Sequence, residues 1–104
     1  MISVTVLYPN QEGAKFDMGY YLGKHIPMVQ KLLGSALKGV SVEQGLGGVA
    51  PGSSAAYSTI CHLFFDSVES FQGAFGPHAA SVQADVRNYS SVTPIIQVSD
   101  VKLS

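Results

Sequence analysis

Residues 2–8 alternate between mostly hydrophobic and mostly polar side chains, and the run ends at Pro9. This two-residue period, rich in β-branched side chains, predicts a strand. Residues 57–65 are β-branched, aromatic and nearly uncharged, which is typical of a central strand covered on both faces. Weaker strand patterns occupy residues 37–45 and 92–101.

Two other segments space their hydrophobic residues as helices do. The first opens at Asp17, whose carboxylate can cap the first free amides, and ends at Gly34. The second follows a cap at residues 66–67, is interrupted at residues 76–77 (Gly-Pro), and ends near Asn88. The pattern therefore predicts two helical segments between the strands.

The predicted order is strand, helix, strand, strand, helix, strand, with the glycine-rich residues 45–54 as a mobile hairpin loop. Right-handed crossovers fold this order into an α+β, ferredoxin-like β-α-β-β-α-β domain over residues 1–104, a four-stranded antiparallel sheet with two helices on one face. The other face also carries hydrophobic residues, such as Ile60 and Phe64. We expect a second copy to cover it, giving a homodimeric α+β barrel; a monomer with an exposed sheet is the alternative.

The composition adds to this picture. Only 12% of the 104 residues are charged and 46% are hydrophobic, and this low charge favours the dimer over the monomer. The net charge is −1 and the six basic residues are scattered, so nucleic acid is an unfavourable partner. With one cysteine, no leader-like start and no apolar run of about 20 residues, we expect a cytoplasmic protein that does not enter a membrane.

The first predicted helix carries a histidine in the middle of its hydrophobic stripe. At about 100° per residue, His25 lies between Tyr21 and Leu22 on the buried side. Pro27 has no amide hydrogen, so we expect the helix to bend or break near His25 and to open a cavity above the sheet. A hydrogen-bonded histidine with a purely structural role is an equally weighted alternative.

If such a cavity forms, the sequence also indicates which residues border it. His25 and Tyr21 are catalytic candidates, with Leu22 beside them as a ligand contact. His78 is a further catalytic candidate because it follows Pro77 at the start of a helix, where the dipole favours a neutral imidazole. The remaining expected ligand contacts are the aromatic residues Tyr8, Phe16, Phe71 and Phe75.

The other candidates for chemistry favour structural roles. We expect His62 to face the dimer interface and Cys61 to be inert packing in the most apolar strand. The three histidines lie on three different elements without ligand spacing, so the sequence predicts no metal site.

Several motifs resemble the EthD family, named for ethyl tert-butyl ether degradation. They are Tyr8-Pro9, the run from Phe16 to Pro27 with its tyrosine pair and His-x-Pro, residues 65–71, residues 84–89 and residues 94–99. The resemblance covers essentially the whole chain. It implies a dimeric α+β barrel in which each protomer has its own cavity, with His25 at the family's first-helix histidine, and relatives that act without metal or cofactor.

Three functions remain open at this stage. The leading hypothesis is a cofactor-independent protein of small-molecule catabolism or secondary metabolism, a monooxygenase or cyclase-like enzyme, in which His25 takes or relays a proton from a hydrophobic ligand while Tyr21 or Tyr8 orients it. The second is a non-catalytic carrier of an apolar metabolite. The third, metal or haem binding, lacks a ligand motif.

Overall fold

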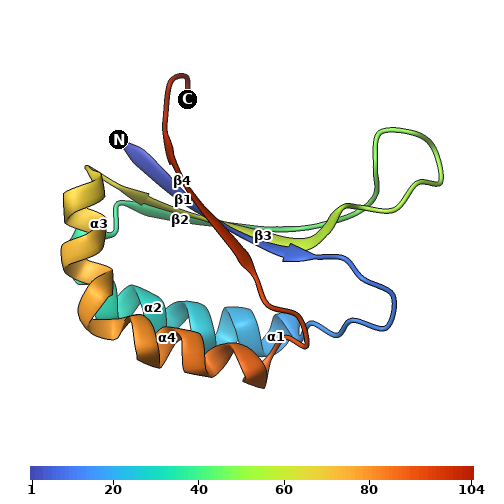
Figure 1. Cartoon of the computed structure of the whole chain (residues 1–104), viewed down its shortest axis with the longest axis horizontal. Coiled ribbons are helices and arrows are strands. Elements are labelled where there is room, and N and C mark those ends of the chain that lie inside the picture. Colours follow the sequence, from blue (N-terminus) through green and yellow to red (C-terminus); the bar gives the residue numbers. More distant parts are fainter.

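The computed structural model describes residues 1–104 as a four-stranded antiparallel sheet with all helices against one face (Figure 1). The strand order is β2-β3-β1-β4, so β3 and β1 are central. The strands are β1 (Ile2–Pro9), β2 (Gly39–Gln44), β3 (Tyr57–Phe65) and β4 (Ile95–Asp100). The predicted α+β, ferredoxin-like fold is confirmed.

The first helical segment contains a π-helical turn at the predicted bend. It consists of α1 (Met18–Tyr20), the π-helix η1 (Tyr21–His25), α2 (Ile26–Leu33) and the 3₁₀ turn η2 (Gly34–Ala36). Asp17 caps it as predicted, because its Oδ1 accepts a hydrogen bond from the Tyr20 amide at 3.0 Å.

The π turn explains how the helix accommodates Pro27. The Ile26 amide bonds to the carbonyl of Tyr21, five residues back, instead of the usual four. The helix therefore continues past the proline without a break, and the predicted deformation near His25 takes the form of one wider turn.

The second helical segment is continuous through its Gly-Pro interruption but changes direction there (Figure 1). It consists of α3 (Val68–Phe75), the 3₁₀ turn η3 (Gly76–His78), α4 (Ala79–Asp85) and the 3₁₀ turn η4 (Val86–Asn88). Ser67, the second of the two residues predicted as caps, accepts a hydrogen bond from the Ser70 amide at 3.0 Å.

Two outer strands are shorter than predicted. β4 begins at Ile95 and not at Val92, because the Ser90 hydroxyl folds the chain by accepting from the Val92 amide and donating to the Val92 carbonyl. β2 begins at Gly39 because the Leu37 amide bonds instead to the Gly34 carbonyl in η2.

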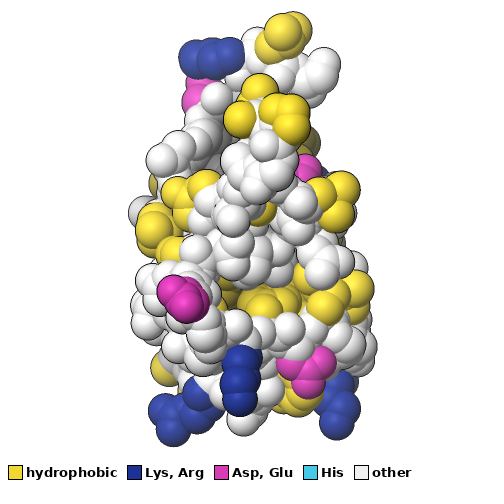
Figure 2. Space-filling view, turned by 90° about the vertical axis from the view of Figure 1, so that its right-hand side faces the viewer, with side chains coloured by type: hydrophobic (Ala, Val, Ile, Leu, Met, Phe, Trp, Pro, Cys, Tyr) yellow, Lys and Arg dark blue, Asp and Glu magenta, His cyan; other side chains and the backbone are white.

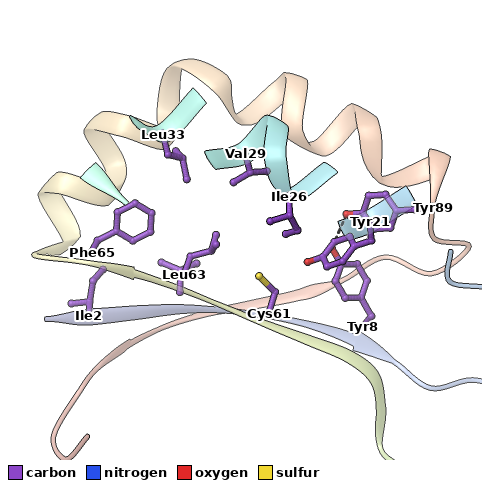
Figure 3. Packing of buried hydrophobic residues seen from close by; sticks show 11 residues of the cluster. Ile2, Tyr8, Tyr21, Ile26, Val29, Leu33, Cys61, Leu63, Phe65 and Tyr89 are labelled. Carbon is purple, nitrogen blue, oxygen red and sulfur yellow. Dashed lines mark hydrogen bonds between the residues drawn. The ribbon is translucent and has the colours of Figure 1, made fainter. Parts of the chain in front are cut away.

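The pairing of β1 with β3 shows which residues share each face of the sheet. Val4 pairs with Leu63 and Val6 with Cys61 on the face toward the helices, while Leu7 pairs with Ile60 on the open face. In Figure 3, side chains from α2 and from the sheet point toward one another across the layer between them. The buried core is Ile2, Val4, Tyr8, Tyr21, Ile26, Val29, Leu33, Cys61, Leu63, Phe65 and Tyr89.

Charged side chains are sparse on the surface. On the end of the molecule shown in Figure 2, hydrophobic side chains gather in several patches, and no histidine is visible there. Leu46 and Val49, in the loop between β2 and β3, are fully exposed. No helix is long and apolar enough to span a bilayer.

We expect Gly34→Ala to lower the free energy of unfolding by about 1–2 kcal/mol. Gly34 ends α2 at φ 58°, and an added Cβ would meet no atom within 4 Å, so the cost comes from backbone conformation alone. The matched control is Gly73→Ala inside α3, where space is equally open and φ is not positive, and which should stabilise by about 0.5–1 kcal/mol. Urea denaturation measures both; equal effects would contradict the argument.

Candidate functional site

A hollow lies between the sheet and the helices, as predicted. It is lined by 17 residues, of which 14 are hydrophobic, and has a volume of about 80 Å³. Val4, Val6 and Leu63 belong to its sheet side, and the opposite side comes from the helices. The lining residues with strongly exposed positions are Ile96 on β4 and Gln83 on α4, so the hollow opens between these two elements.

His25 borders this hollow from the π turn. It is 4% exposed and continues a buried row in which Tyr21, His25 and Val29 are spaced four residues apart. Its ring stacks on that of Tyr21, with 5.4 Å between centroids and 13° between planes. The wider π turn places these two rings on the same side of the helix, facing the sheet.

Both ring nitrogens of His25 have partners. Nδ1 lies 2.8 Å from Oδ2 of Asp85, and Nε2 lies 3.3 Å from the hydroxyl of Tyr89. The structural role considered for His25 is therefore present, since its polar atoms are satisfied. His25 also borders the hollow, which is the position that its predicted functional role requires.

Asp85 receives three hydrogen bonds. Besides His25, the Tyr20 hydroxyl donates to Oδ1 at 2.7 Å and the Asn88 amide donates to Oδ1 at 2.9 Å. The Asp85 side chain is 16% exposed. Burial alone would raise the pKa of this carboxyl, but the hydrogen bonds from Asn88, His25 and Tyr20 outweigh it and hold the pKa below its ordinary value. Asp85 is therefore an anion at neutral pH.

Three buried tyrosines surround the imidazole. The Tyr8 and Tyr89 hydroxyls lie 2.7 Å apart, and Tyr21 packs edge-on against Tyr8 (Figure 3). Burial raises the pKa of the Tyr8, Tyr21 and Tyr89 phenols. These hydroxyls therefore remain protonated at neutral pH and are available as hydrogen-bond donors.

Most of the predicted site residues meet at the hollow. His25, Tyr21, Tyr8, Phe71 and Phe75 all line it. Phe16 is not in the lining but packs behind two of them, with ring centroids 4.9 Å from Tyr8 and 5.0 Å from Tyr21.

Two predicted residues lie elsewhere. Leu22 is 50% exposed and outside the hollow, because the π turn holds more residues than an α turn and rotates this position toward solvent. His78 is half-buried in η3 and also outside the lining, because the helix changes direction there and Val82 of α4 and Val86 of η4 line the hollow instead.

Sequence reasoning missed Asp85 and Tyr89 as site residues. Their spacing offered a signal for the pair, since positions four apart lie on the same face of a helical segment, but it did not identify His25 as their partner.

The remaining polar and thiol groups lie outside this cluster or serve as packing. His62 lies on the open face of the sheet, with Nδ1 3.3 Å from the Thr5 hydroxyl and Nε2 3.7 Å from Glu43. Cys61 belongs to the sheet side of the hollow, and burial raises the pKa of its thiol. No three side chains among histidine, cysteine, aspartate and glutamate come together as a set of metal ligands.

Comparison with known proteins identifies relatives of this chain. The family model described as the EthD domain matches residues 11–93. The crystal structure of an EthD-like protein from Ralstonia eutropha JMP134 is similar, with a TM-score of 0.94 and 42% identity over 99% of this chain and 93% of that chain. An ethyl tert-butyl ether degradation (EthD) family protein from Bacillus halodurans C-125 gives a TM-score of 0.74 and 19% identity over 97% and 98%.

A more distant structure shares the fold. It is described as a dimeric ferredoxin-like protein of unknown function from Thermobifida fusca YX, with a TM-score of 0.59 and 16% identity over 96% of this chain and 90% of that one. No curated protein matches the chain.

We expect Tyr89→Phe to lower the free energy of unfolding by about 1–3 kcal/mol, because the buried Tyr8 hydroxyl and His25 Nε2 lose their shared partner. Tyr8→Phe added to Tyr89→Phe should cost less than the sum of the single changes, since the pair is removed together. Tyr57→Phe, at a half-buried tyrosine of β3 outside the cluster, is the control. Additive costs in urea denaturation would show that the two hydroxyls are not coupled.

Proposed function

Because the chain belongs to the EthD domain family, we propose that it binds a small, neutral, hydrophobic molecule in the hollow and that His25 takes or relays a proton of that ligand. One observation carries the proposal: a buried imidazole, flanked by a carboxylate and a phenol, borders an otherwise apolar hollow. Family membership by itself leaves the reaction open.

The size and lining of the hollow support a ligand of this kind. A cavity needs about 10–15 Å³ to hold one water, so a hollow of about 80 Å³ suits a compact molecule such as a single ring. The scarcity of polar lining residues disfavours a charged ligand, because an ion would lose its hydration without replacement. A carbonyl or phenol oxygen, in contrast, can accept a hydrogen bond from a protonated tyrosine.

Proton transfer at His25 follows from the chemistry of its neighbours. The buried tyrosines have raised pKa values, so their phenols do not ionise at neutral pH and cannot act as the base. A neutral imidazole has a ring nitrogen with a lone pair, so His25 is the group of the lining suited to accept a proton. An acidic C–H next to a carbonyl, or a phenol O–H, is the matching donor.

The few polar groups in the lining also favour a second candidate, a carrier that binds the same class of molecule without changing it. The two functions share the hollow and differ in whether His25 exchanges a proton with the ligand.

The test is a panel of small aromatic ketones and phenols studied by NMR in D₂O. We expect the wild type to bind members of the panel and to speed deuterium exchange next to the carbonyl, with a loss of about 10²–10⁴-fold in rate for His25→Gln. His62→Gln, at the open face of the sheet, is the matched control and should leave the rate unchanged.

Val82→Trp, which places a large ring in the lining from α4, should abolish binding. Binding without exchange in the wild type would select the carrier. Absence of binding across the panel, or exchange unaffected by His25→Gln, would refute the proposed chemistry.

We also propose that two copies of the chain pack through the open face of the sheet. Hydrophobic Leu7, Ile60 and Phe64 lie on this face, and the surface carries few charges. The Thermobifida fusca structure, described as dimeric, supports this assembly by analogy of fold.

We expect light scattering to report a dimer for the wild type and a monomer for Phe64→Arg, because the arginine would bury an unpaired charge between two sheets. Leu22→Arg, at a half-exposed position on the helical side, should remain dimeric. A monomeric wild type, or an unchanged Phe64→Arg dimer, would rule out this interface.

A further inference from the structure

The two carboxylate oxygens of Asp85 have different hydrogen-bond partners. Oδ1 accepts from the Tyr20 hydroxyl at 2.7 Å and from the Asn88 amide at 2.9 Å. Oδ2 faces Nδ1 of His25 at 2.8 Å. Tyr20 of α1 and His25 of the π turn come from the first helical segment and Asn88 of η4 comes from the second, so both helical segments orient one carboxylate.

This arrangement determines which nitrogen of the neutral imidazole carries the hydrogen. The pKa of Asp85 lies below its ordinary value, so the carboxylate carries no hydrogen and can only accept. The hydrogen of the 2.8 Å bond must therefore belong to Nδ1. A neutral imidazole has one hydrogen, which leaves a free lone pair on Nε2.

The free lone pair of Nε2 sets the direction of the remaining hydrogen bonds. Tyr89 can donate its hydroxyl hydrogen to Nε2 across 3.3 Å, and its oxygen is then free to accept from the Tyr8 hydroxyl at 2.7 Å. Each hydroxyl in this order donates once, so the chain from Tyr8 through Tyr89 to His25 is consistent. Tyr21 stacks on the ring and does not bond to either nitrogen.

We infer that Asp85 is a positioning residue that keeps the hydrogen of neutral His25 on Nδ1, so that Nε2, in contact with Tyr89, is the proton acceptor of the site. Asp85 is absent from the lining of the hollow and acts only through His25. The inference deepens the proposed function and, for its catalytic consequence, rests on it.

The proton transfer balances along this path. A ligand C–H or O–H proton passes to the Tyr89 oxygen while the Tyr89 proton moves to Nε2, or it reaches Nε2 directly once the Tyr89 hydroxyl has turned away. The electron pair stays on the ligand as an enolate or phenolate. The resulting imidazolium keeps its Nδ1–H on the Asp85 carboxylate, which stabilises the new positive charge.

Asp85→Asn gives a sharp test because the orientation of the new amide is predictable. The Tyr20 and Asn88 donors require an oxygen at the Oδ1 position, which turns the amide NH₂ toward His25. Nδ1 must then accept, and the hydrogen must move to Nε2. Tyr20→Phe, which removes one donor to Oδ1 and leaves the contact with His25 intact, is the matched control.

The experiment is ¹⁵N NMR of the His25 ring in alkaline solution, paired with the deuterium-exchange assay. We expect an Nδ1–H ring in the wild type and in Tyr20→Phe, and an Nε2–H ring in Asp85→Asn with exchange reduced by about 10²-fold or more. Circular dichroism checks that each variant is folded.

The outcomes separate the inference from the proposed function. An Nε2–H ring in the wild type overturns the inference without any variant, and an unchanged ring in folded Asp85→Asn does so as well. A switched ring with undiminished exchange supports the role of Asp85 in placing the hydrogen but refutes His25 as the proton acceptor. A switched ring with reduced exchange supports both.

Discussion

Burying the imidazole of His25 requires a hydrogen-bond partner for each of its ring nitrogens, and this requirement organises the end of the molecule around it. Asp85 supplies one partner from α4, and Tyr89 supplies the other from the segment after η4. Tyr89 in turn bonds to Tyr8 of β1. One buried ring thereby ties a central strand to both helical segments, and a change at any of these positions affects the others.

Local sequence patterns predicted most of the architecture because the relevant forces act locally. The alternation along β1, the apolar character of β3 and the cap at Asp17 all involve neighbours within a few residues. His25 was also correctly placed in the buried stripe. Asp85 and Tyr89 escaped prediction because they meet His25 across 60 and 64 residues of sequence, a distance that no periodicity encodes.

The errors at the site have equally physical causes. Leu22 was assigned to the stripe with a constant rotation per residue, whereas the π turn of η1 carries it to the surface. Pro27 indicated a deformation, but the sequence does not distinguish a kink from a wider turn. His78 was expected at the site from its place at the start of a helix, but it lies in η3, where the helical segment changes direction, and it does not line the hollow. The two ends of each helical segment and the sites of deformation within it were predictable, whereas the form of each deformation was not.

Five of the residues that line the hollow are valines: Val4 and Val6 on the sheet, and Val29, Val82 and Val86 on the helical segments. These side chains are short, and longer ones at the same positions would fill part of the hollow. None of the five belongs to the hydrogen-bonded cluster of His25. Exchanges among the valines could therefore reshape the range of accepted molecules over evolutionary time while the ionisable machinery stays intact, a modular division that lets one scaffold diversify.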